Sequence, residues 1–498
     1  MKWTACKPKL ELGIIAAIAF ISAYLTLKIL WLHSGRVFFS VEKALSMNLD
    51  LARIVYVALI PILWLCFLIF LQRWTTRPLE WLLGTVSIGI QLLILVAWLG
   101  DDPGIIGSKV LLGLPLLAGL IFLFVRGDRP EGIAELRSYL FPHRAIWAAA
   151  LLVAAAVGLR YFEAYLHLAF FREGAVGDEQ FFWWTSAERF LRIGLDGYLH
   201  QDFPGGSYFP NYPFFSAIFL GFLSASHASA ALYSLPLLYG ILVLWFWWQG
   251  LNFYSFRDKL LATAFFSALL LYHDWVFVLF HEVWFGEAMA VIAFYLIFCL
   301  LAKKSAPNTR DLFLAYGIGA FAVLSKPPLS YLLIPAVLPA YVFLGVLLQG
   351  AGRRSLCLRA GACGVGALVS QFLWKKYLLD SQFTLFYSGA NFGSMLSWET
   401  WNLSSGAFPK LLAYIFPTYK MHWLAFALLA GLAIRRDFRE FLPGILVTLG
   451  VVLSIFILYA TLWSNQDHES AARYVLQPLL AWTFFAFQKT LASGKTKG

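Results

Sequence analysis

Apolar runs of about 20 residues recur along almost the whole chain, separated by short polar segments. A helix of that length is what the hydrocarbon core of a bilayer requires. Composition agrees, since 60% of the 498 residues are hydrophobic and 13% are charged, whereas soluble domains carry roughly 25% charged residues. The pattern excludes a soluble fold and predicts an all-α, polytopic membrane protein.

Basic residues account for a net charge of +11. They lie in short clusters at the ends of apolar runs, where the positive-inside rule expects cytoplasmic Lys and Arg. A nucleic-acid partner is therefore not expected, while membrane lipid is. The clusters include Arg73 with Arg77, Arg126 with Arg129, Arg257 with Lys259, Lys303 with Lys304 and Arg310, Arg353 with Arg354 and Arg359, and Arg435 with Arg436 and Arg439.

Orienting the runs by these clusters predicts about fourteen transmembrane helices with both termini in the cytoplasm. Residues 1–143 are expected to form a four-helix N-terminal extension, and residues 144–498 a transmembrane core. Outer loops are predicted at about 171–229 and 375–420, the first carrying juxtamembrane helices. Expected crossings include Trp81–Gly100, Ile105–Val125, Met289–Leu301, Leu312–Ser325, Leu329–Leu348 and Ala360–Trp374.

Acidic residues stand out on the predicted outer face. Asp178 and Glu179 are adjacent in the first outer loop, and Glu282 follows His281 in a short turn predicted between two crossings. Carboxylates at such positions can act as a general base or bind a metal ion. Helix capping by Asp178 and Glu179, and solvation of the turn at the interface, explain them structurally instead.

Two cations also lie on the predicted outer side, where the positive-inside bias gives no reason for them. Lys326 stands at the end of a crossing, and Arg473 precedes Tyr474 and the last crossing. A phosphate group would be a suitable partner for both cations. Snorkelling of Lys326 and a salt bridge from Arg473 to Glu469 are the alternatives.

Polar and aromatic side chains accompany these charges in the predicted outer loops. Their mixture suits stacking against a sugar and hydrogen bonding to it, although proline-punctuated loop structure explains most of it equally well. Motifs for phosphate loops, dinucleotides and zinc proteases are absent from the sequence, so neither a nucleotide nor a redox cofactor is expected. The candidate substrate-binding residues are His200, Asp202, Tyr208, Asn211, His281, His468 and Tyr474.

The order of these groups resembles the GT-C superfamily of membrane glycosyltransferases: an outer-loop Asp-Glu pair, an acid in the next outer turn, Lys-Pro after a later crossing and Arg-Tyr before a terminal one. It is most similar to protein O-mannosyltransferases and lipid A aminoarabinose transferases, over about Arg144 to Gln488. The resemblance implies a GT-C-like catalytic core. It also implies roles for five residues: Asp178, Glu179 and Glu282 as catalytic acids, and Lys326 and Arg473 as ligands of the donor phosphate.

The expected activity is transfer of a hexose or pentose, with inversion, from a polyprenyl-phosphate donor to a glycan, lipid or protein acceptor. Magnesium or manganese bound by Asp178 and Glu282 would suit their hard oxygen atoms. The expected location is a bacterial inner membrane, with the endoplasmic reticulum as alternative. Two other functions stay open: a transporter or flippase, which would show substrate counterflow, and a glycan polymerase or ligase, which would use a diphosphate-linked donor.

Overall fold

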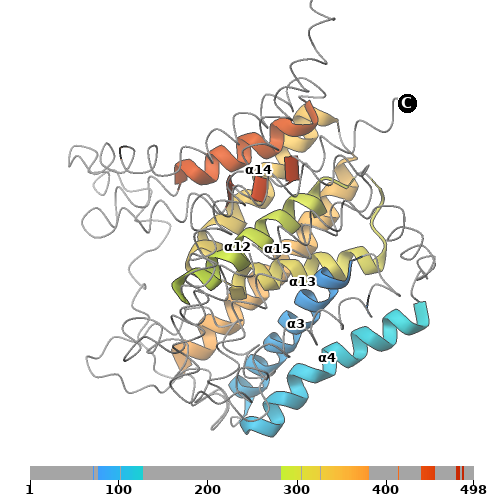
Figure 1. The fold of residues 1–498 in the computed structure, drawn as a ribbon, viewed down its shortest axis with the longest axis vertical. Coiled ribbons are helices and arrows are strands. Elements are labelled where there is room, and N and C mark those ends of the chain that lie inside the picture. Colours follow the sequence, from blue (N-terminus) through green and yellow to red (C-terminus); the bar gives the residue numbers. More distant parts are fainter. Residues whose placement is uncertain are drawn as a thin grey trace, which may run out of the picture.

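The computed structural model describes part of the chain, and all regular structure in that part is helical (Figure 1). The described residues are 71, 77–100, 103–126, 282–303, 305–325, 327–350, 352–380, 413, 439–454, 478, 479, 481, 482, 485 and 486. Their helices are α3 (Pro78–Leu99), α4 (Gly104–Arg126), α12 (Glu282–Leu301), α13 (Thr309–Ser325), α14 (Pro327–Gln349) and α15 (Arg353–Asp380), with a further helix at residues 439–454. The all-α prediction is confirmed for these residues.

Two helical stretches, Glu80–Leu99 in α3 and Arg353–Lys376 in α15, are long and apolar enough to cross a membrane. Shorter apolar stretches occur in other helices, at Ile106–Ile121, Ile292–Leu301 and Val337–Gln349. By length and composition, the described part of the chain therefore contains segments suited to a bilayer.

Local sequence signals explain where several helices begin and end. Pro78 occupies the first turn of α3, where its missing N–H costs nothing. Asn308 caps α13, because its side-chain oxygen accepts a hydrogen bond of 2.8 Å from the Asp311 amide. Gly350 follows α14 with a φ of 60°, a left-handed conformation that favours glycine after a helix.

Helix α13 lies at the centre of the described bundle and contacts α3, α12, α14 and α15. On the far side of α3, helix α4 forms one edge of the molecule (Figure 1). Every residue of α13 from Gly317 to Ser325 is buried. Any movement of α13 would therefore disturb several neighbouring helices.

Glycines allow the backbone of α13 to approach its neighbours closely. A Cβ atom added at Gly317 would lie 2.7 Å from the Cα atom of Gly84 in α3. A Cβ at Gly319 would collide with the carbonyl oxygen of Cys363 in α15, and one at Gly366 would collide with the carbonyl oxygen of Tyr316. Such small-residue contacts are typical of helices that associate within membranes.

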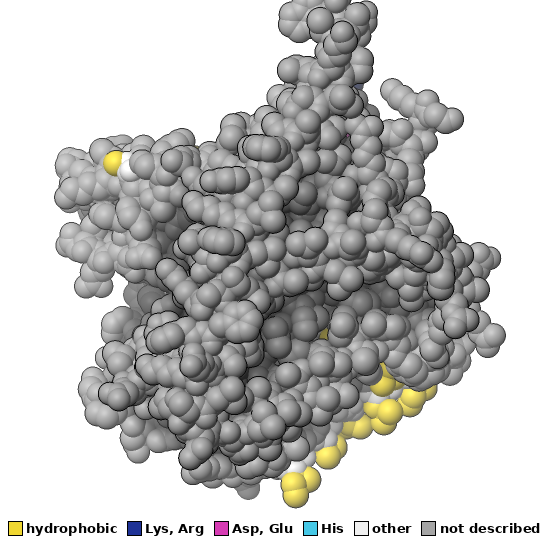
Figure 2. Space-filling model, viewed as in Figure 1, with side chains coloured by type: hydrophobic (Ala, Val, Ile, Leu, Met, Phe, Trp, Pro, Cys, Tyr) yellow, Lys and Arg dark blue, Asp and Glu magenta, His cyan; other side chains and the backbone are white. Residues whose placement is uncertain are grey.

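The outward face of α4 is apolar along its length. Ile106, Val110, Leu114, Leu117 and Ile121 are each at least half exposed. Their spacing of three or four residues puts them on one side of the helix, and Figure 2 shows them as a row along the edge of the molecule. A continuous apolar row of this kind is suited to contact with lipid chains rather than with water.

Two observed helices extend by more than a turn beyond the predicted crossings. Helix α12 begins at Glu282 rather than near Met289, so the residues from Glu282 to Glu287 are helical instead of forming a turn. Apolar residues without proline continue the helix there, and an acid is favourable in a first turn. Helix α15 extends to Asp380, so the first residues of the loop predicted at about 375–420 are helical as well.

Candidate functional site

Of the residues proposed for catalysis or substrate binding, Glu282 is the one whose backbone the structure describes. It is the first residue of α12. Lys326 lies outside the described residues but stands in the chain between Ser325, the last residue of α13, and Pro327, the first of α14. The remaining candidates also lie outside the described residues: Asp178, Glu179, His200, Asp202, Tyr208, Asn211, His281, His468, Arg473 and Tyr474.

The backbone brings the start of α12 and the end of α13 to the same end of the bundle. These helices are neighbours joined by the short segment 302–308, so they run in opposite directions. With 20 residues in α12 and 17 in α13, their lengths are about 30 and 25 Å. The first residue of α12, Glu282, and the last residue of α13, Ser325, therefore lie at about the same level of the bundle, far from segment 302–308.

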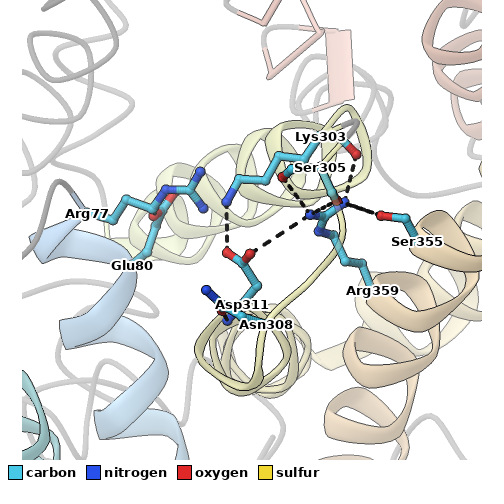
Figure 3. A network of polar contacts seen from close by, with 8 residues as sticks. All are labelled: Arg77, Glu80, Lys303, Ser305, Asn308, Asp311, Ser355 and Arg359. Atoms are coloured by element: carbon cyan, nitrogen blue, oxygen red, sulfur yellow. Dashed lines mark hydrogen bonds and ion pairs between the residues drawn. The ribbon is translucent and has the colours of Figure 1, made fainter. Parts of the chain in front are cut away.

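The opposite end of the bundle carries a cluster of charged residues, shown in Figure 3. The Nζ atom of Lys303 donates a hydrogen bond of 3.1 Å to Oδ1 of Asp311. Both side chains are 20% exposed, so water screens this ion pair only in part. This ion pair joins the start of the α12–α13 segment to the first turn of α13.

Arg359 of α15 joins the same cluster with its side chain fully buried. Its Nη1 atom donates to the Lys303 carbonyl at 2.7 Å and to Oγ of Ser355 at 2.9 Å. Its Nη2 atom donates to the Ser305 carbonyl at 2.6 Å and lies 3.9 Å from Oδ2 of Asp311. One guanidinium group thus fastens the α12–α13 segment to the start of α15.

The start of α3 completes this cluster. Nε of Arg77 lies 3.3 Å from Oε2 of Glu80, and the guanidinium of Arg310 lies 5.4 Å above the ring of Trp81. The Trp81 ring also packs against Phe313, with 5.4 Å between ring centroids. Cation–π and aromatic contacts therefore join the beginnings of α3 and α13.

The pKa values of the charged pair follow from this crowding. Burial acts to raise the pKa of the Asp311 carboxyl, but the hydrogen bond and charge of Lys303 outweigh it, so that pKa lies below its usual value. Charges of Arg77 and Arg359 act in the same direction on Asp311. Burial lowers the pKa of Lys303, and repulsion from Arg77 adds to this effect.

Three basic clusters that the sequence predicts to be cytoplasmic meet at this end, represented by Arg77, Lys303 and Arg359. The helix at residues 439–454 begins beside the end of α14, where Nε2 of Gln349 donates to the Glu440 carbonyl at 2.6 Å. The charged cluster joins the start of α3, the α12–α13 segment and the start of α15. The geometry of this cluster explains how the helices are held together and does not suggest a catalytic role.

A second polar group lies inside the bundle. Nε2 of Gln91 in α3 donates to Oγ of Ser370 at 2.7 Å and to the Gly366 carbonyl at 3.2 Å. Oε1 of Gln91 accepts a hydrogen bond of 2.8 Å from the hydroxyl of Tyr316. This network was not predicted from the sequence. The feature of the sequence that could have indicated it is Gln91, an amide inside an otherwise apolar run. A buried amide is unfavourable unless it has a hydrogen-bond partner.

Metal binding was expected at Asp178 and Glu282, and the first of these lies outside the described residues. Within the described part of the chain, no group of three or more His, Cys, Asp or Glu side chains could hold a metal ion. Comparison of the chain with protein-family models, with curated proteins and with solved structures finds no match.

Proposed function

We propose that this chain is a multi-pass membrane glycosyltransferase that moves a sugar from a polyprenyl-phosphate donor to an acceptor outside the membrane. The observation that carries the proposal is the order of charged motifs along the sequence: Asp178-Glu179, Glu282, Lys326-Pro327 and Arg473-Tyr474. The same order resembles the GT-C superfamily.

Chain direction in the described helices supports this proposal. Glu282 begins α12, and Lys326 directly follows α13 in the chain. Glu282 and Ser325, the residue before Lys326, lie at the ends of their helices away from the cluster of Arg77, Lys303 and Arg359. Since Lys and Arg favour the cytoplasmic side, the ends of α12 and α13 at Glu282 and Ser325 are the outer ends in this proposal.

The proposed mechanism is a single displacement. The Asp178 carboxylate removes the proton from an acceptor hydroxyl, whose oxygen attacks the anomeric carbon as the bond to the phosphate oxygen breaks. Lys326 and Arg473 stabilise the negative charge on the departing polyprenyl phosphate. One displacement inverts the anomeric configuration. Glu179 and Glu282 are further acids of the site.

Lipid-linked donors explain why the site belongs at the membrane surface. The polyprenyl chain stays in the bilayer while the sugar phosphate reaches its outer face, so the base and the cations must be at that height. Magnesium or manganese held by carboxylates would share the charge of the departing phosphate. The proposed location is a bacterial inner membrane, and the acceptor is a glycan, a lipid or a protein.

The test measures sugar release from a panel of polyprenyl-monophosphate sugars by purified protein in detergent, with crude membrane extract as the source of acceptor. Wild type is compared with Asp178→Asn and with Asp101→Asn, which changes an acid outside the motif that the predicted topology puts on the outer side. We expect release by wild type and Asp101→Asn, and a loss of about 100-fold or more in Asp178→Asn. A chelator arm tests the metal.

Equal release by all three proteins would remove Asp178 from the mechanism. Release from a diphosphate-linked oligosaccharide alone would favour a polymerase or ligase. Substrate counterflow in proteoliposomes, without transfer, would favour a transporter.

A further inference from the structure

The polar network inside the bundle joins the N-terminal extension to the core. Gln91 belongs to α3, while Tyr316 and Ser370 belong to α13 and α15. The partners are separated by 225 and 279 residues in the chain. The amide nitrogen of Gln91 donates hydrogen bonds to α15, and its amide oxygen accepts one from α13. One side chain thus connects three helices.

Close backbone contacts give α13 little freedom around this network. Gly317 packs against Gly84 of α3, and the Tyr316 carbonyl packs against Gly366 of α15. The Gly366 carbonyl is also an acceptor for Gln91. The hydroxyl and carbonyl of Tyr316 are thus held from two sides, by α3 and by α15.

Lys326 follows α13 directly, ten residues after Tyr316, which is about 14 Å along the helix from Tyr316 to Ser325. Since residues 317–325 are buried and helical, a shift at Tyr316 moves the whole outer end of α13. Packed helices transmit such shifts as rigid bodies.

We propose that Gln91 and Tyr316 are positioning residues that act through α13: they fix its outer end at Ser325, the residue that directly precedes Lys326 in the chain. The phosphate-binding role of Lys326 rests on the proposed function. The positioning of α13 by Gln91 does not, and the two parts are tested separately.

The first experiment measures the position of the outer end of α13 without any enzyme assay. A Lys326→Cys variant in right-side-out vesicles is treated with a membrane-impermeant maleimide, and the rate of modification is measured. Gln91→Leu is added to this variant in one arm and Ser87→Ala in another. Ser87 is the matched control because it is buried on α3 but donates only to the Leu83 carbonyl of its own helix.

We expect Gln91→Leu to change the modification rate by about threefold or more, and Ser87→Ala to leave it unchanged. Tyr316→Phe, which removes only the hydroxyl bonded to Gln91, should reproduce the effect. Combining it with Gln91→Leu should add little, because both changes break the same contact. Equal rates in the Gln91→Leu and Ser87→Ala arms would overturn the positioning role.

The second experiment measures donor kinetics with the native Lys326. Gln91→Leu should raise KM for the polyprenyl-phosphate sugar by about tenfold while KM for the acceptor stays constant. A smaller folded fraction would lower kcat and leave both KM values unchanged, so that result would overturn the proposal. If the labelling difference is present but wild type uses no donor, the proposed function fails while the anchoring of α13 by Gln91 is supported.

Discussion

Arg359 is buried at the charged end of the bundle, and both Nη atoms of its guanidinium group donate hydrogen bonds. The acceptors are the carbonyl oxygens of Lys303 and Ser305 and the hydroxyl of Ser355. A buried charge is costly unless hydrogen bonds satisfy it. Removing Arg359 would therefore remove several partly buried hydrogen bonds and would separate α15 from the α12–α13 segment.

Arg359→Ala is expected to destabilise the protein by about 3 kcal/mol, because it removes several hydrogen bonds that a buried guanidinium group donates. The measurement is the thermal unfolding midpoint in detergent. Arg354→Ala is the matched control, since Arg354 belongs to the first turn of the same helix and is exposed. Its expected effect is within about 0.5 kcal/mol. Equal losses in both variants would contradict the buried role of Arg359.

Asp311 makes stability depend on pH. Its pKa in the folded protein lies below the ordinary value of 3.8, because its pairing with Lys303 outweighs burial. A lowered folded pKa adds stability that is present above the ordinary pKa and is lost as the pH falls through the folded pKa.

Asp311→Asn should therefore lower the free energy of unfolding at pH 7 by about 1 kcal/mol, as for a partly exposed ion pair. Tm should fall accordingly. The difference from wild type should stay constant down to about pH 5 and close below that as Asp311 takes up a proton. The measurement is Tm against pH for both proteins. A difference that persists unchanged at pH 3 would show that ionisation of Asp311 does not contribute.

At the scale of elements, α13 depends on glycine for its contacts with α3 and α15. Because the opposing atoms are backbone atoms, they cannot move aside as a flexible side chain can. Other glycines of the same helices are free of such contacts. Gly361 in α15 has nothing within 4 Å of a Cβ built on it.

Gly366→Ala and Gly361→Ala should have opposite effects, although both place alanine in α15. At Gly366 the added methyl group meets the Tyr316 carbonyl, so we expect a loss of about 1–3 kcal/mol. At the exposed Gly361 the higher helix propensity of alanine should give a gain of up to about 1 kcal/mol. Tm values in detergent decide this, and a gain at Gly366 would contradict the close α13–α15 contact.

At the scale of the whole molecule, the part that the structure describes has apolar side chains on its surface as well as in its core. Many exposed positions on α4 and α15 are apolar, for example Leu114 and Phe372. Buried positions include polar side chains that bond to one another or to backbone, for example Gln91 and Ser370. Charges are concentrated where helices end (Figure 3). This arrangement matches a bundle whose sides meet lipid and whose ends meet water.

Spin labels should distinguish these surfaces after reconstitution into vesicles. A nitroxide on Leu114→Cys is expected to be relaxed by oxygen, which concentrates in the bilayer, and little by a water-soluble nickel complex. The matched label on Arg354→Cys should show the reverse preference. The measurement is the ratio of the two accessibilities. A high nickel accessibility at Leu114 would show that the apolar face of α4 does not meet lipid.

Helix positions were predictable because their signals are local. The crossing expected at Trp81–Gly100 is α3 at Pro78–Leu99, and that at Leu329–Leu348 is α14 at Pro327–Gln349. Boundaries were less predictable where a helix continues beyond the apolar run, as in α12 and α15. Hydropathy follows the width of the bilayer, whereas a helix ends where its backbone loses its hydrogen bonds. For the candidate site, the predictions at Asp178 and Arg473 stay predictions.

The amino-acid sequence by itself determined that the described chain is helical, apolar and charged at its helix ends, because those properties depend on neighbours within a few turns. Only the tertiary structure decided which ends meet and which polar groups pair. Arg359 could have faced water like Arg354, and Gln91 could have bonded elsewhere. Their partners lie 56 residues away for the Lys303 carbonyl and 279 for Ser370. Buried polar groups must find a partner, and the packing of distant helices selects it.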